Sequence, residues 1–244
     1  MTLSSPLIFW TLIIFLALAG LVILIIRNAS QHRKGFAALA KELGFTYERD
    51  SPELLEQFKD FRLFVPDRYR SWQIAYNVLK GKTGSATVCL FDYSYHIKSG
   101  SFQHDFTICA LRSPDLKLPY FYLRHKFLTE MVNPFPVKKG VLLESHPTSM
   151  EFGESEIDFP EDEKFTKKFV LQGKEEVVRP LFDVDLRQHL LPLGDIWHTP
   201  ARVEGNRDTL MLIATGPTEA KNARELIQQT TNLFTLFSQR TESW

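Results

Sequence analysis

The pattern of hydrophobic and polar positions divides the chain near residue 26. Residues 6–26 read PLIFWTLIIFLALAGLVILII and carry no charged side chain. A helix of this length rises about 31 Å, close to the thickness of the hydrocarbon layer of a bilayer. The pattern therefore predicts a transmembrane helix over 6–26, preceded by a short extracytoplasmic tail over 1–5. A cleaved secretory signal is the competing interpretation, but the tail has no basic residue and the apolar run is too long.

A helical spacing of apolar residues resumes directly after the span. Phe36, Leu39, Ala40 and Leu43 lie three or four positions apart, and Gly44 is a natural helix end. This spacing predicts a juxtamembrane helix, which either continues the membrane helix or follows it after a short break.

From Gln73 the apolar period changes to two, which is typical of strands. Two strands, Gln73–Lys80 and Ser85–Tyr95, flank the glycine-containing connection Gly81–Gly84. Further strands are expected at Phe102–Arg112 and Tyr120–Arg124. Because the connections are short, we predict an antiparallel meander of three or four strands.

The remaining chain divides into a linker and a second lobe. Residues 133–162 contain four prolines, and seven acidic residues without a basic one lie between Glu151 and Glu163. We therefore predict a first lobe over 27–132, an irregular linker over 133–162 and a second α+β lobe over 163–244. The second lobe is expected to contain a strand, two short helices and a hairpin: Lys168–Gln172, Glu175–Phe182, Asp185–Leu191, and Pro200–Glu204 with Thr209–Thr215 joined through residues 205–208.

A long C-terminal helix is expected to close this α+β fold. Its apolar stripe includes Ala223, Ile227, Phe234 and Phe237 at helical spacing, and Pro217 marks its start. The stripe predicts a helix buried against a sheet.

The two cysteines lie within predicted strands among apolar residues. If the connection after Tyr95 turns about Ser99, Cys89 lies directly opposite Cys109, and Val88, Leu90, Phe106, Ile108 and Ala110 share one face. Directly opposite side chains are farther apart than a disulfide spans, and a reducing compartment disfavours the bond. We therefore expect neighbouring free thiols.

Charge indicates the orientation of the chain and excludes one class of partner. Arg27, Arg33 and Lys34 follow the span, whereas no basic side chain precedes it. Since Lys and Arg near a span stay on the cytoplasmic side, we expect the soluble region to be cytoplasmic and the N-terminus to face outward. The 29 basic and 29 acidic residues balance. A neutral chain lacks the basic surface that nucleic-acid binding needs, so the expected partners are the lipid bilayer, through 6–26, and an unknown protein.

Few residues are candidates for catalysis or for binding a metal. The seven histidines form no HExxH pair, and no nucleophile motif is present, so no catalytic residue, resident metal or cofactor is predicted. The nearest approach to a cluster flanks the predicted hairpin tip and comprises Asp92, His96, His104 and Asp105. Imidazoles and carboxylates together can bind a divalent metal or exchange protons, although polar residues also occur at exposed hairpin ends for no functional reason.

Several segments carry a resemblance to a known group of proteins. They are Asn77–Gly81, Val88–Tyr95, Ile157–Phe159, Phe169–Gly173 and Val178–Phe182. The chain from about Phe36 to the last helix resembles a family of uncharacterised bacterial single-pass membrane-anchored proteins without an assigned activity. The resemblance implies a protein of the bacterial inner membrane, and it implies no catalytic residues.

Two hypotheses about function remain. The lack of a catalytic signature favours a membrane-tethered cytoplasmic binding or scaffolding module over an enzyme. The alternative is a membrane-anchored metal-assisted hydrolase that uses the hairpin of His96 and His104. The two hypotheses differ in whether these side chains and Asp92 converge.

Overall fold

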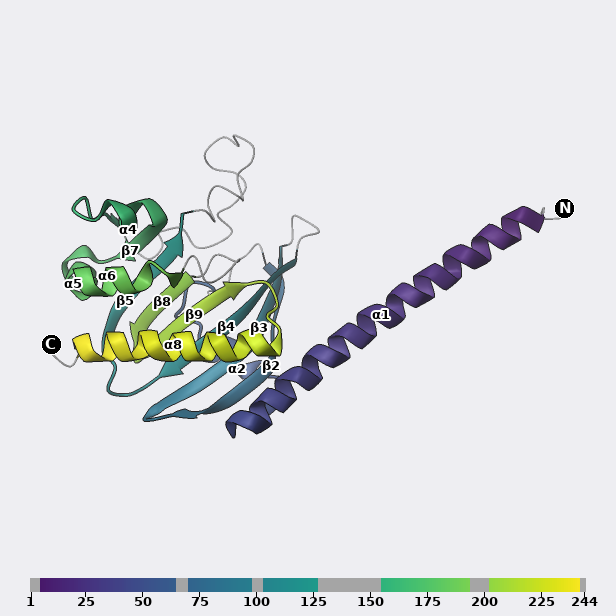
Figure 1. Ribbon diagram of the computed structural model, residues 1–244, viewed down its shortest axis with the longest axis horizontal. Coiled ribbons are helices and arrows are strands. Elements are labelled where there is room, and N and C mark those ends of the chain that lie inside the picture. The colour runs from purple at the N-terminus through teal and green to yellow at the C-terminus, as the bar shows by residue number, and fades with distance from the viewer. Residues whose placement is uncertain (1–4, 65–69, 98–102, 127–154, 194–201, 242–244) are drawn as a thin grey trace.

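The computed structural model describes residues 5–64, 70–97, 103–126, 155–193 and 202–241 (Figure 1). Helix α1, Ser5–Leu43, is one continuous helix of 39 residues that includes both the apolar run and the predicted juxtamembrane helix. It ends at Gly44, whose positive φ of 69° suits a helix end. The apolar part extends away from the sheet, with Trp10 and Ile14 62% and 57% exposed. It is long and apolar enough to cross a membrane.

The described residues contain one sheet of nine strands, and all neighbouring strands are antiparallel. The strands are β1 Thr46–Asp50, β2 Arg70–Thr83, β3 Ala86–Ile97, β4 Gln103–Arg112, β5 Leu118–His125, β6 Ser155–Ile157, β7 Phe169–Gly173, β8 Arg202–Arg207 and β9 Thr209–Thr215. Together with the helices they form the predicted α+β fold.

The order of the strands is β1-β2-β3-β4-β9-β8-β5-β7-β6. Strands β2, β3 and β4 form the predicted meander. The fourth strand, β5, does not continue it, because the β8–β9 hairpin from the C-terminal part of the chain lies between β4 and β5. The two expected lobes therefore share one sheet.

Helices cover one face of this sheet, here called the helical face. They are the end of α1, α4 Glu163–Lys168, α5 Glu175–Leu181, α6 Val184–Leu190 and α8 Ala220–Thr241. The opposite face is covered over β2, β3, β4 and β9 by α2, Glu53–Gln57, and by apolar side chains of residues 58–64. Each face has its own hydrophobic core, so both faces of the central strands are apolar.

The long C-terminal helix is present and its stripe packs on the helical face. Ala223 and Phe237 are fully buried, and Ile227 is nearly so. The ring of Phe237 stacks on Phe121 at a centroid distance of 5.1 Å. Phe234 packs against the edge of this core but is only partly buried, so the expectation of its full burial was wrong.

The connection between the first two strands of the meander is shorter than predicted. Strand β2 continues to Thr83, which pairs with Ala86, so the turn consists of Gly84 and Ser85 alone. Gly84 has φ of +57°, as the first position of a tight hairpin turn requires. Gly81 lies within the strand, where the ring of Phe45 occupies the space that a side chain would need.

The predicted register of the cysteines was wrong by one residue. Cys89 lies opposite Ala110, and Cys109 lies opposite Leu90. Cys109 therefore belongs to the core of the helical face with Val88 and Leu90, whereas Cys89 shares the opposite face with Phe106, Ile108 and Ala110. Since both faces are apolar, the alternation of side chains did not specify the register. Both thiols are free and buried.

The predicted linker over 133–162 lies mostly outside the described residues. Its described end contains β6, which pairs with β7 at the edge of the sheet. The hairpin of the second half is also tighter than expected, because Asn206 pairs with Thr209 and leaves only Arg207 and Asp208 in the turn.

Candidate functional site

The structure separates the four residues that the sequence grouped at the hairpin. Tyr95 pairs with His104, and the two rings stack at 5.0 Å on the face opposite to Asp92. His96 shares the face of Asp92 but lies four positions farther along β3, where its ring stacks with Trp72 at 6.2 Å. The two histidines therefore lie on opposite faces of the sheet. Among the described residues, no group of three or more metal-ligating side chains could hold an ion.

Asp92 and Asp105 do belong to polar contacts, although not to the expected ones. Asp105 contacts the Ser94 hydroxyl and accepts a hydrogen bond of 2.7 Å from Gln103 Nε2. Asp92 is completely buried on the helical face, directly beneath α1. Burying a carboxylate without partners costs free energy, so the role of Asp92 depends on the groups that hydrogen-bond to it.

Three side chains from three elements satisfy the Asp92 carboxylate. His32 Nε2 of α1 lies 2.9 Å from Oδ2, Asn77 Nδ2 of β2 donates to the same oxygen at 2.8 Å, and the Thr107 hydroxyl of β4 donates to Oδ1 at 2.7 Å. Because Oδ2 is an acceptor, Nε2 carries the hydrogen in this arrangement. His32 thus attaches the C-terminal part of α1 to the centre of the sheet.

The polar contacts around Asp92 extend to two further elements. The Tyr47 hydroxyl of β1 donates to Asn77 Oδ1 at 3.1 Å, and burial raises the pKa of Tyr47 despite the nearby charge of Arg33. On the other side, the backbone N–H of Thr218, just before α8, donates to Thr107 Oγ1 at 2.9 Å. The polar groups that surround Asp92 therefore join α1, the first four strands and the entrance to α8.

Local backbone geometry makes the junction possible. Asn77 has φ of +52° at an irregularity where the pairing of β2 and β3 shifts between Tyr76 and Leu79. Asparagine tolerates this conformation better than most residues. Farther along α1, Gly35 approaches Ala220 of α8 so closely that a Cβ at Gly35 would lie 3.1 Å from the Ala220 Cβ. We name the set His32, Asn77, Asp92 and Thr107 the α1 junction.

Sequence reasoning missed most of this junction. The sequence pattern groups Asp92 with a hairpin tip. Its position inside the apolar strand LFDYSY is the one signal that it is buried. A carboxylate inside such a strand needs buried donors. Its partner His32 is 60 positions away, and no local pattern identifies a contact of that range.

A second buried carboxylate, Glu204 of β8, lies on the face opposite to α1. Its Oε1 accepts hydrogen bonds from the backbone N–H of Arg62 at 2.7 Å and from the Tyr120 hydroxyl at 2.9 Å. Its Oε2 has no hydrogen-bond partner within the described part of the chain. Burial raises the pKa of Glu204 to about 7, although both hydrogen bonds and the charges of Arg62 and Arg202 act in the other direction. Glu204 can therefore exchange a proton near neutral pH.

A cavity of about 510 Å³ lies at the end of the strands remote from His96, beside the β8–β9 turn. Phe58, Phe61, Leu116 and Leu118 are among its apolar lining residues. Two ion pairs lie at its margin, Arg112 with Asp208 at 2.6 Å and Arg207 with Asp60 at 3.5 Å. This combination of apolar lining and charged margin suits the binding of a side chain or small apolar group.

Comparison with known proteins shows the fold. No family model matches the chain, and no curated protein matches it. The chain is similar to a solved structure, the crystal structure of the mycobacterial trehalose monomycolate transport factor A, TtfA, with a TM-score of 0.57 and 14% identity. The similarity covers 84% of this chain and 93% of TtfA. The TM-score shows that the two proteins share a fold, and at 14% identity the similarity shows no more than the fold.

Proposed function

We propose that this chain is a single-pass inner-membrane protein whose sheet domain binds and positions a partner protein at the cytoplasmic surface. The observation that supports this proposal is the continuity of α1 and its attachment through the α1 junction. Phe36, Leu39 and Ala40 of the same helix are buried in the core of the helical face. A domain joined to its membrane helix in this way is held at one height above the membrane, which favours docking onto another membrane protein.

The orientation rests on the basic residues that follow the span. Arg27, Arg33 and Lys34 are exposed on α1 and favour a cytoplasmic domain. A reporter fused after Trp244 tests this expectation. Activity of a reporter that works only in exported compartments would contradict it.

The structural neighbour suggests the class of partner. TtfA is named as a transport factor for trehalose monomycolate. By analogy of fold, we propose that the partner belongs to a membrane transport assembly. We do not propose the metal-assisted hydrolase, because His96 and His104 lie on opposite faces of the sheet.

The decisive experiment separates attachment to the membrane from rigid placement. A flexible Gly-Ser segment inserted between Asn28 and Ala29 breaks α1 between the span and His32. The insertion leaves the span and the α1 junction unchanged. A photo-crosslinking residue at Lys117, an exposed residue beside the cavity, reports partner contact in native membranes.

We expect a discrete adduct with an integral membrane protein, and we expect the insertion to abolish it while the domain stays folded and membrane-bound. The matched control is the same segment inserted between Gly84 and Ser85, in the turn between β2 and β3 and outside α1, which should leave the adduct intact. An adduct that survives the insertion in α1 would show that rigid placement is not needed.

A further inference from the structure

Two large apolar side chains remain exposed on the helical face of β2. Trp72 is 43% exposed and Ile74 is 40% exposed, and both lie on the same face because they are two positions apart. Trp72 stands opposite His96 of β3. The pair Trp72 and Ile74, here called the β2 apolar pair, thus lies beyond the part of this face that α1 covers.

The contacts of α1 show where the β2 apolar pair lies relative to the apolar part of that helix. The ring of Phe45, just after α1, contacts β2 at Gly81, and His32 contacts Asp92, which stands opposite Tyr76. Towards its N-terminus, α1 therefore follows β2 from residue 81 to residue 76. From Tyr76 to Trp72 the strand continues about 13 Å, at about 3.3 Å per residue.

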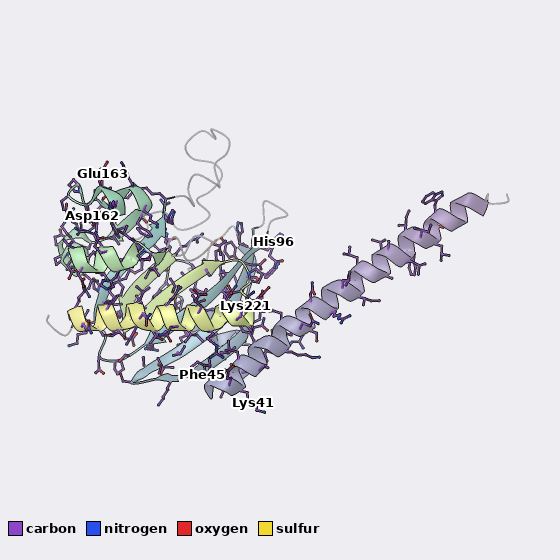
Figure 2. All side chains as sticks on the ribbon, viewed as in Figure 1. Lys41, Phe45, His96, Asp162, Glu163 and Lys221 are labelled. Atoms are coloured by element: carbon purple, nitrogen blue, oxygen red, sulfur yellow. The ribbon has the colours of Figure 1, made fainter. Side chains whose placement is uncertain are left out.

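Over the same interval α1 approaches the bilayer. From His32 to Ile26, the last apolar residue of the predicted span, the helix rises about 9 Å. In Figure 1, β2, β3 and α1 all slope from the lower left to the upper right. Figure 2 shows His96, the neighbour of Trp72, at the end of the sheet nearest the N-terminal half of α1. Trp72 therefore reaches about the level at which α1 enters the hydrocarbon layer.

The side chains near Trp72 at this end of β2 suit the boundary between headgroups and hydrocarbon. Tryptophan is enriched where hydrocarbon meets headgroups, because its ring is apolar and its N–H is polar. Exposed basic side chains at Arg27, Arg33 and Lys34 lie on the adjoining part of α1. Such residues attract anionic headgroups towards the same surface.

We propose that the β2 apolar pair enters the headgroup region of the bilayer that α1 spans and forms a second membrane contact. This inference rests on the proposed insertion of α1. A single helix leaves the domain free to rotate about the helix axis, whereas a contact away from that axis fixes the rotation. The second contact thereby determines which edge of the sheet is presented to a membrane-embedded partner.

Tryptophan fluorescence tests this contact in the full chain. The chain has four tryptophans, at positions 10, 72, 197 and 244. One variant keeps only Trp72 and another keeps only Trp10, with phenylalanine at the remaining positions. Each is reconstituted in vesicles of phosphatidylcholine and phosphatidylglycerol whose acyl chains carry bromine atoms close to the headgroups.

The control carries a tryptophan in place of Val184 and phenylalanine at all four native positions. Val184 is 61% exposed on α6, among the helices over the other half of the sheet. We expect the emission of Trp72 to be quenched and to shift to the blue relative to unbrominated detergent micelles. The Val184→Trp control should show neither change.

The outcomes separate this contact from the anchor itself. Quenching of both Trp10 and Trp72 supports the second contact. Quenching of Trp10 without quenching of Trp72 overturns the second contact and leaves the anchor intact. If Trp10 is not quenched, the insertion of α1 fails, and both proposals fail with it. Equal quenching of Trp72 and of the Val184→Trp control overturns the second contact, because it indicates nonspecific adsorption.

Discussion

Replacing Glu204 by glutamine should remove a pH dependence of stability that the wild-type chain shows. The carboxyl is fully buried, and its Oε2 lacks a hydrogen-bond partner within the described residues. Burial raises its pKa to about 7 from the ordinary 4.5. In the unfolded chain the same carboxyl is in water and ionises near its ordinary value.

The sign and the size of the effect follow from this difference. Between the two pKa values the folded state binds more protons than the unfolded state, so stability falls as pH rises. The contribution of Glu204 is fully present below pH 4.5 and is lost as pH rises through about 7. At about 1.4 kcal/mol for each pKa unit the whole effect is about 3 kcal/mol, and most of it falls between pH 5 and 8.

Unfolding by guanidinium, followed by fluorescence in detergent at pH 5, 6, 7 and 8, measures the effect. The informative quantity is the difference in unfolding free energy between the wild type and Glu204→Gln. This difference should change by about 2–3 kcal/mol across the series in favour of the variant at high pH. Its absolute value at one pH also contains the cost of the new amide donors, whereas its slope does not. Glu176→Gln, at an exposed position of α5, is the matched control and should give a flat difference.

A difference for Glu204→Gln that stays constant within about 0.5 kcal/mol from pH 5 to pH 8 would refute the reasoning. It would mean that the carboxyl has the same pKa in the folded and unfolded states. Water or another polar group would then have to satisfy Oε2 in solution.

Three further predictions concern the core and the α1 junction. Phe237→Ala should lower the free energy of unfolding in guanidinium by about 3–5 kcal/mol, because Phe237 is fully buried. Phe234→Ala should lower it clearly less, because Phe234 is only partly buried. Equal losses would contradict the packing of α8. His32→Ala should cost about 1.5–3 kcal/mol by the same measurement, since it leaves a buried carboxylate without one donor; a cost below about 0.5 kcal/mol would contradict the junction. Burial raises the pKa of Cys89 and Cys109 to about 12, so maleimide at pH 7 should modify these thiols only after the chain unfolds. Mass spectrometry measures the modification. Rapid modification of the folded chain would contradict the burial of the two cysteines.

The elements of this fold could be predicted from local patterns to the extent that the patterns were distinctive. The alternation after Gln73 and the helical stripe around Ala223 and Phe237 placed strands and a helix close to where they lie. The register of the cysteines was missed because residues on both sides of β3 and β4 are apolar. When both faces of a sheet are apolar, shifting the pairing of two strands by one residue moves one set of apolar side chains to the other face. Both registers then bury apolar side chains, so the pattern does not choose between them.

The arrangement of these elements and the candidate site required contacts of long range. Nothing near β4 indicates that its second neighbour is β9, whose register places Cys109 opposite Leu212. The α1 junction was missed for the same reason, because Asp92 and His32 meet only when α1 lies on the sheet. The sequence indicates that a buried carboxylate needs a hydrogen-bond donor, but it does not identify which residue is the donor.

The insertion of the β8–β9 hairpin between β4 and β5 also has a consequence for how the chain is made. When β4 leaves the ribosome, its outer edge has no partner until β9 is synthesised. The ribosome must add the residues between Arg112 and Thr215 first, which takes about 5–20 s at about 5–20 residues per second. During that interval a nascent chain whose first helix is apolar exposes an unpaired strand edge, and such edges readily bind other strands. Early docking of α1 onto β2 and β3 would keep these strands ordered while the edge of β4 waits for its partner.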